Sequence, residues 1–147
     1  MSKIKLHIAM ASVASAIALL ATPVAGQQAS VSRQLEKATQ IMSGKGYAQA
    51  ERDLRGSLKD DERAQYTIFL QKGTAYRIFG FCDNDCRDMD LLLFDENGNK
   101  VAEDTSTDDI PVINITPKWT GKFTLRVDMD DCRRNPCGWG VRIFAPR

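Results

Sequence analysis

The spacing of hydrophobic residues changes along the chain. Near the N-terminus it is that of a helix, and over most of the remaining chain hydrophobic and polar residues alternate. Over residues 27–43, apolar side chains recur at a spacing of three and four residues, which forms one stripe along a helix. The stripe consists of Val31, Leu35, Ala38 and Met42. We expect this helix to end at the glycines that follow it and to pack on its own domain. The alternative is a helix that docks on a partner or pairs two copies of the chain.

From Gln65 onward, apolar and polar residues alternate with the period of two that half-buried β-strands show. The clearest strand runs over residues 122–129, in which every second side chain is apolar. Further strands are predicted over 65–71, 74–81, 91–94, 100–103, 110–116 and 139–143. Residues 54–58 are compatible with an irregular strand, whereas residues 48–52 could continue the helix. Seven or eight short strands separated by turns predict a mainly β protein, an antiparallel β-sandwich with an N-terminal helix.

Three local signals refine the arrangement of these strands. Asn97-Gly98 tolerates the positive φ of a tight turn and therefore predicts a hairpin. Pro111 has no backbone N–H, so the strand that it begins is expected at a sheet edge. Residues 91–94 are apolar on both faces, which predicts a central strand that is covered on both sides.

The N-terminal segment has the pattern of an export signal over residues 1–26. Lys3 and Lys5 precede an apolar run of about 14 residues, and small residues follow for cleavage after Ala25 or Gly26. A membrane anchor is the alternative, but the run is shorter than the roughly 20 residues that cross a bilayer. We therefore divide the chain into a signal peptide (1–26), a helical extension (27–46) and a β-sandwich domain (47–147). We expect a periplasmic or secreted protein without membrane insertion after cleavage.

Charge and histidine content exclude several classes of function. Removing the signal takes Lys3 and Lys5 from the 20 basic residues, which then nearly balance the 19 acidic ones. This balance gives no general attraction to nucleic acid. His7 is the only histidine and lies in the signal, which excludes Ser-His-Asp and Cys-His catalysis and histidine-ligated metal sites. The remaining chain also contains no Ser-x-x-Lys motif and no glycine-rich phosphate loop.

Four cysteines occur as two pairs, Cys82 with Cys86 and Cys132 with Cys137. In an exported chain an even number indicates disulfides, although four cysteines allow three connectivities that the sequence cannot separate. We favour the two local bridges because each pair flanks a polar turn, and each closed loop would contribute about 2 kcal/mol to stability. One rival is a zinc ion held by all four thiolates, which an oxidising compartment disfavours. A redox pair is disfavoured as well, because neither spacing is C-x-x-C.

An acidic cluster around the first cysteine pair is the sharpest chemical feature of the chain. It comprises Asp83, Asp85, Asp88 and Asp90, and we expect Asp104, Asp108 and Asp109 of a facing loop to join it. Calcium takes six to eight oxygen ligands, which acidic loops at one end of a sandwich can supply. An EF-hand is excluded, because Asp88 and Phe94 stand where its glycine and its last glutamate belong. We favour a structural role, in which the carboxylates accept backbone N–H bonds, over calcium binding and over ligand recognition.

Two further features concern the surface. Trp119 lies in a turn and is the aromatic residue that we expect to be exposed. It either covers a sheet edge, which we favour, or contacts a ligand or partner. Arg133 and Arg134 lie inside the second cysteine pair, and we expect them to form salt bridges with the neighbouring Asp130 and Asp131.

Three motifs together carry a resemblance to a known family. They are Leu70-x-x-Gly73-x-x-Tyr76, Asp88-x-Asp90-Leu-x-Leu-Phe-Asp95-x-x-Gly98, and Thr120-Gly121-Lys-Phe123-x-Leu-Arg-Val127. Over residues 54–144 the chain resembles bacterial pre-peptidase C-terminal domains and their small stand-alone relatives. The resemblance implies a jelly-roll-like β-sandwich, usually an accessory module of secreted enzymes that sometimes binds calcium or an extracellular polymer. The two cysteine pairs, the helical extension and the lack of a peptidase domain depart from the usual pattern.

The function that we expect follows from these patterns. It is an exported, non-catalytic module of the bacterial cell envelope that binds an unidentified envelope protein or polymer. A calcium-binding accessory module is the first alternative, with Asp88 and Asp90 as the foremost ligands, and no other cofactor is expected. A small secreted hydrolase is the second alternative, which we disfavour because the carboxylates crowd into one turn instead of facing each other across a cleft.

Overall fold

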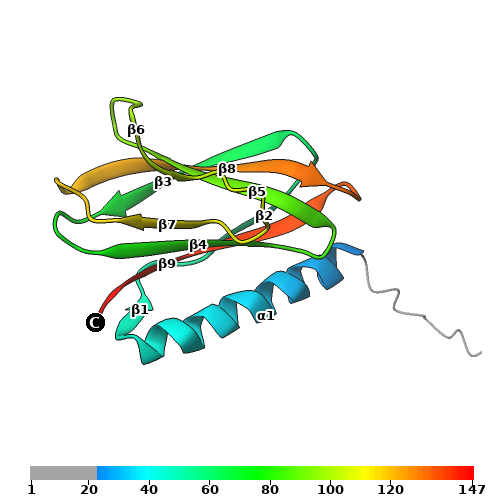
Figure 1. The fold of residues 1–147 in the computed structure, drawn as a ribbon, viewed down its shortest axis with the longest axis horizontal. Helices are drawn as coiled ribbons and strands as arrows, with labels where there is room; N and C mark the ends of the chain where they lie inside the picture. Colours follow the sequence, from blue (N-terminus) through cyan, green and yellow to red (C-terminus); the bar gives the residue numbers. More distant parts are fainter. Residues whose placement is uncertain (1–22) are drawn as a thin grey trace, which may run out of the picture.

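The computed structural model describes residues 23–147, and residues 1–22, which hold most of the predicted export signal, lie outside this range. The described chain forms one helix, α1 (Pro23–Gly44), and nine strands (Figure 1). The strands are β1 (Tyr47–Gln49), β2 (Leu54–Leu58), β3 (Glu62–Leu70), β4 (Tyr76–Cys82), β5 (Cys86–Phe94), β6 (Lys100–Asp104), β7 (Val112–Ile115), β8 (Gly121–Cys132) and β9 (Cys137–Pro146). No helix of the described part is both long enough and apolar enough to cross a membrane.

The strands form two sheets that pack face to face. The first sheet has the order β1-β9-β4-β7, with β2 also paired to β9, and the second has the order β3-β8-β5-β6. Every pairing is antiparallel. Helix α1 lies along the outer face of the first sheet, below β9 in Figure 1. The predicted antiparallel sandwich with an N-terminal helix is therefore confirmed, with nine strands in place of seven or eight.

Alternation along the strands builds the core between the sheets. The apolar positions of β8 point inward and are at most 2% exposed; they are Phe123, Leu125, Val127 and Met129. Strand β5 lies inside its sheet, as its two apolar faces predict. Its inner residues Leu91 and Leu93 are fully buried, and Leu92 on the outer face is also buried.

A second, smaller core joins α1 to the first sheet. The four stripe residues of the helix are all buried, and they pack against Phe81 and Phe144 on the outer face of that sheet. The helix can come this close because β9 carries glycine at position 140. A Cβ atom there would lie 2.7 Å from Cγ1 of Val31 and 3.1 Å from Cδ1 of Leu35. The prediction that the helix packs on its own domain is confirmed.

The local signals have mixed outcomes. Strand β7 is a sheet edge, as Pro111 predicts. The turn between β5 and β6 contains Gly98 at φ +81°, as Asn97-Gly98 predicts, and Asp95 accepts hydrogen bonds from the backbone N–H groups of Asn97 and Asn99 across it. The option that residues 48–52 continue the helix is wrong: Gly46 turns the chain at φ +82°, and Tyr47–Gln49 pairs with the end of β9.

Candidate functional site

Both cysteine pairs lie at the same end of the sandwich, where the chain passes from one sheet to the other. The Cys82–Cys86 disulfide joins the end of β4 to the start of β5, and Cys132–Cys137 joins the end of β8 to the start of β9. Each spans 5.9 Å between Cα atoms. Because Cys86 and Cys132 are register partners in the second sheet, the two bridges are adjacent. They are the local pairs that the sequence favoured, and they close both corners of this end.

Asp83 ties the two disulfide loops together. Its side chain accepts hydrogen bonds from the backbone N–H groups of Asp85 (2.9 Å) and Gly138 (2.6 Å), and the residue is only 3% exposed. The loops also meet through Arg133, whose backbone N–H donates to the carbonyl of Asp85 and whose guanidinium donates to the carbonyl of Asn84. This carboxylate therefore has the structural role that we favoured from the sequence.

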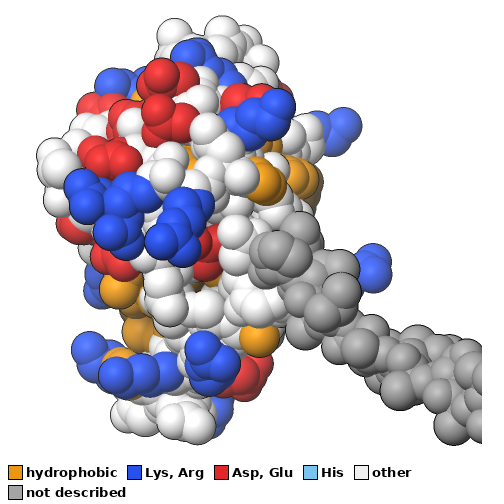
Figure 2. Space-filling view, turned by 90° about the vertical axis from the view of Figure 1, so that its right-hand side faces the viewer, with side chains coloured by type: hydrophobic (Ala, Val, Ile, Leu, Met, Phe, Trp, Pro, Cys, Tyr) orange, Lys and Arg blue, Asp and Glu red, His pale blue; other side chains and the backbone are white. Residues whose placement is uncertain are grey.

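The salt-bridge partners of Arg133 and Arg134, in the second disulfide loop, differ from those predicted from the sequence. Asp130 and Asp131 form no salt bridge with them in the described part; Arg134 instead approaches Asp85 across the gap between the loops, at 3.9 Å. The strand continues through Asp130 and Asp131 to Cys132, so the two arginines belong to the turn beyond the strand. The salt-bridge partners of these arginines depend on the strand register, which the sequence alone does not show. At this end of the molecule, basic and acidic side chains are mixed over the surface (Figure 2).

The facing loop uses its acidic residues locally. Asp104 accepts hydrogen bonds from Ser106 and from the backbone N–H of Val112. Burial is the largest effect on the pKa of Asp104 and raises it, but these hydrogen bonds outweigh burial and hold the pKa below its ordinary value. Asp108 accepts from the backbone N–H of Ile110. These two carboxylates close their own loop instead of joining Asp83.

Asp88 and Asp90 lie in a different environment, on the outer face of the second sheet. Strand register places Asp90 opposite Asp128 of β8, and Asp130 follows on the same face two residues later. The only salt bridge formed by these four aspartates in the described part joins Asp128 to Arg126, at 2.8 Å. One side-chain oxygen of Asp88 and one of Asp128 are buried without a hydrogen-bond donor. The sheet therefore concentrates negative charge here with little compensation.

This crowding changes how the carboxyl groups titrate. Burial, followed by the negative charges of Asp130 and Asp88, raises the pKa of Asp90 to about 7. Burial, together with the charges of Asp130 and Asp108, also raises the pKa of Asp88. Near neutral pH a substantial fraction of Asp90 is therefore protonated.

By their hydrogen bonds and strand positions the six calcium candidates form three groups, and Asp108 of the second group lies close enough to Asp88 of the third to raise its pKa. Asp83 and Asp85 hold the disulfide loops, Asp104 and Asp108 hold the facing loop, and Asp88 with Asp90 joins the carboxylates of β8. Among residues 23–147, no three side chains of histidine, cysteine, aspartate or glutamate converge in a position to hold a metal ion.

Trp119 differs from its sequence prediction. Its side chain is half-buried, and its ring stacks on Phe123 with ring centroids 5.4 Å apart, so it is not the exposed residue that we expected. Its indole N–H is buried without an acceptor among the described residues. The indole packs against the core beside Phe123, whereas the favoured interpretation had it covering a sheet edge.

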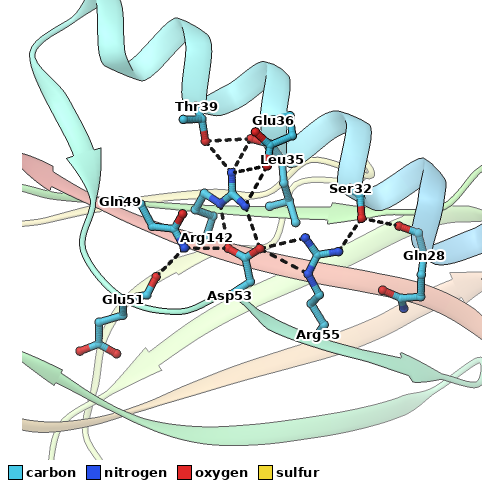
Figure 3. A network of polar contacts seen from close by, with 10 residues as sticks. All are labelled: Gln28, Ser32, Leu35, Glu36, Thr39, Gln49, Glu51, Asp53, Arg55 and Arg142. Atoms are coloured by element: carbon cyan, nitrogen blue, oxygen red, sulfur yellow. Dashed lines mark hydrogen bonds and ion pairs between the residues drawn. The ribbon is translucent and has the colours of Figure 1, made fainter.

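A polar network that the sequence did not reveal fixes the helix to the first sheet (Figure 3). Arg142 of β9 is 5% exposed and donates two hydrogen bonds to Asp53, at 2.7 and 2.8 Å. It also donates to the backbone carbonyl of Leu35 and to the hydroxyl of Thr39 on α1. Burial is the largest effect on the pKa of Asp53 and raises it, but hydrogen bonds from Arg142 and Arg55 outweigh burial and lower the pKa.

Comparison with known proteins supports the fold. No protein-family model matches the chain, and no curated protein matches it. Among solved structures, the pre-peptidase C-terminal domain of a collagenase from Bacillus anthracis is similar with a TM-score of 0.50 and 17% identity, covering 63% of this chain and 87% of that domain. The chain has the fold of a pre-peptidase C-terminal domain. A periplasmic inhibitor of g-type lysozyme from Aeromonas hydrophila shows a weaker likeness, with a TM-score of 0.43 and 16% identity over 67% of this chain and 86% of the inhibitor.

Sequence reasoning missed Arg142, Asp128 and Asp130. All three occupy polar positions in alternating strands, where a charged residue is ordinarily expected to face water. Asp53 lies 89 residues before Arg142, and strand register alone brings Asp90 opposite Asp128. The one available signal was indirect: Gly138 and Gly140 alternate with large apolar residues, which indicates close approach of another element over that face of the strand.

Proposed function

We propose that the protein is an exported, non-catalytic module that binds an acidic protein or polymer of the cell envelope through its disulfide-closed end. The observation that carries this proposal is the loop between Cys132 and Cys137, which is anchored on several sides while its arginines face solvent. The side chain of Arg134 is 84% exposed. Two disulfides in one small domain are typical of oxidising compartments and support export.

The loop between Cys132 and Cys137 is rigid because its backbone and the side chain of Asn135 are hydrogen-bonded to other parts of the domain. The carboxylate of Asp60 accepts from the N–H of Cys132, and the backbone N–H of Asp60 donates to the side chain of Asn135, each at 2.7 Å. Gln27 of α1 donates to the carbonyl of Pro136 at 2.8 Å. A loop that is already ordered loses little conformational entropy on binding, and so presents its arginines efficiently to a partner. Arginine also suits carboxylate and phosphate groups, which it binds with two parallel hydrogen bonds.

Capture from envelope extract tests the proposal. The purified protein should retain a partner saturably, and added salt should weaken the interaction because the arginines are exposed. Arg134→Glu should lower the affinity about tenfold, a change of roughly 1.4 kcal/mol. Lys118→Glu, another exposed cation outside the disulfide loops, serves as the matched control and should bind normally. Repeated failure to recover any partner would contradict the proposal, and equal binding by Arg134→Glu would place the interface elsewhere.

Calcium binding is a second candidate, and the observation that favours it is the uncompensated carboxylates of Asp88 and Asp90. Their hard oxygen donors suit calcium, but the described side chains supply no third converging ligand. Any bound ion would therefore take most of its ligands from water and backbone carbonyls, and we expect weak binding. Thermal melts test calcium binding: the protein is first stripped of metal with a chelator, and its Tm is then measured with increasing calcium. A calcium-specific rise in Tm that Asp90→Asn removes would support the site, and an unchanged Tm up to millimolar calcium would contradict it.

A further inference from the structure

A recessed apolar groove runs between helix α1 and the part of the first sheet that the helix leaves uncovered. It consists of two hollows of about 310 Å³ each, which share Met42 and Phe79. One hollow opens beside Ile41 of the helix and Ile110 of the loop before β7. The other continues along β4 and β7 past Val112. Each hollow is at the lower end of the roughly 300–1,000 Å³ range of small-molecule sites.

Apolar side chains at the surface concentrate at this groove. Among the described residues, the large hydrophobic side chains left exposed are Ile41 (51%), Ile110 (42%) and Phe69 (51%). The first two face the same hollow from opposite sides, whereas Phe69 belongs to the other sheet. Phe79 and Phe81 form the floor between them and stack on each other with ring centroids 6.2 Å apart.

The charges along the groove are all positive. Lys37 lines the first hollow, and Lys45 and Arg77 line the second, with no acidic residue in either lining. In the described part of the chain, no carboxylate lies within 4 Å of these three cations. Arg77 is held in place by a hydrogen bond to the side chain of Asn114 and by the ring of Tyr47, 5.9 Å from its guanidinium carbon. An apolar floor with unpaired cations at its rim is complementary to an apolar chain that carries an anion.

Shape and charge select among the possible occupants. A second copy of the chain would bring Lys37, Lys45 and Arg77 against the same three cations if the contact were symmetric, which like charges oppose. A flat bilayer does not enter a recessed groove. A stable protein–protein interface uses roughly 20–30 residues on each side, far more than line these hollows. A single extended acyl chain satisfies both the narrow shape and the apolar lining.

We propose that this groove binds a single-chain anionic amphiphile, a fatty-acyl chain that ends in a carboxylate. The chain lies over Phe79, Phe81 and Met42, and Ile41 and Ile110 close over it from the sides. The carboxylate pairs with the cations of the rim. The groove reaches the Cys82–Cys86 bridge, where Gln34 of its lining donates to the carbonyl of Cys82. Its lining contains neither Arg133 nor Arg134, so the inference goes beyond the proposed partner binding and does not depend on it.

Titration with dodecanoate, below its micelle concentration, tests the proposal on the full chain expressed with its own leader. Amide NMR signals of α1 and β4 should shift saturably with one site per chain. Dodecyltrimethylammonium has the same chain length and the opposite charge, and should bind at least about fivefold more weakly. Lys37→Glu should reduce this preference, because it replaces a cation of the rim by an anion.

Matched variants locate the site. Ile41→Gln removes one exposed apolar wall and should weaken dodecanoate binding about tenfold, whereas Phe69→Gln removes an equally exposed side chain elsewhere and should leave binding unchanged. The proposal is overturned if dodecanoate produces no saturable shift, if both amphiphiles bind equally, or if Ile41→Gln binds normally. A dimer in sedimentation experiments that Ile41→Gln dissociates, but that dodecanoate leaves intact, would also overturn it. Binding of the chain to anionic vesicles without any binding of dodecanoate would overturn it as well.

Discussion

Two aspartates, Asp53 and Asp90, titrate in opposite directions because of what surrounds them. Both side chains are largely shielded from solvent, which by itself raises a carboxyl pKa. Arg142 and Arg55 surround Asp53 and reverse that effect, whereas Asp90 faces other carboxylates that increase it. One residue type therefore stabilises the fold at neutral pH in the first case and opposes it in the second.

The effect of Asp90 on stability should depend on pH. The pKa of Asp90 in the folded protein lies near 7, above its ordinary value of 3.8. Protonated Asp90 therefore favours the folded protein fully below about pH 4, and this contribution to the free energy of unfolding is lost as the pH rises through about 7. Asp90→Asn should therefore raise the free energy of unfolding by about 2 kcal/mol at pH 8 and change it little at pH 4. Urea denaturation at both pH values measures this. Asp109→Asn, at an exposed carboxylate, is the control, and an equal gain there would show that the effect is only one of net charge.

The opposite dependence should appear at Arg142. Arg142→Met leaves Asp53 mostly buried without its main donor and should cost about 3 kcal/mol at pH 7. Because the folded pKa of Asp53 is lowered, the stability of the pair is present above about pH 4 and is lost as the pH falls through that lowered value. The loss in Arg142→Met should shrink accordingly in acid denaturation experiments. Arg55→Met, on the more exposed side of the network, should cost under about 1 kcal/mol.

At the scale of the elements, the attachment of α1 depends on close contact with β9. In Gly140→Val the added Cβ atom would itself press on Val31 and Leu35, so the substitution should lift the helix and destabilise the protein by about 2 kcal/mol. Hydrogen exchange should then speed up in α1 before it does in β8. Gly44→Ala is the control, since no atom lies within 4 Å of an added Cβ there, and it should leave exchange unchanged. Slow exchange in α1 of Gly140→Val would show that the helix is held by the Arg142 network alone.

The elements differ in how far the sequence determines them. The alternation of Phe123 to Met129, the Asn97-Gly98 turn and Pro111 are local signals, and each predicted its structure correctly. Strand β1 was not predictable, because three residues acquire strand geometry only by pairing with the end of β9.

The candidate sites were less predictable than the strands for the same reason. The local hydrogen bonds of Asp83 follow from turn chemistry, but its bond to Gly138 crosses 55 residues. The acidic face that includes Asp90 exists only through the register of β5 with β8. The groove beside Ile41 depends on where the helix crosses the sheet, which no pattern within the helix specifies.

On the scale of the whole molecule, the two disulfides act on one end and should not contribute independently. Replacing either pair by alanines should cost about 2 kcal/mol, since each closes a short loop. Because Asp83 bonds across both loops, removing both pairs should cost more than the sum of the single losses. Thermal melts of the two double variants and of the quadruple variant form the cycle that measures this coupling. Strict additivity would contradict a shared role for the two bridges.

The course of the chain also determines how the molecule would respond to pulling. Helix α1 begins beside Pro136 at the disulfide end, and β9 runs from that end to the C-terminus at the other, as Figure 1 shows. Force applied between the two ends of the domain would therefore act along α1 and β9 and slide them past each other. Sliding loads the Arg142 contacts and the strand hydrogen bonds together, whereas peeling would break them one at a time. The domain would therefore resist tension best along this axis.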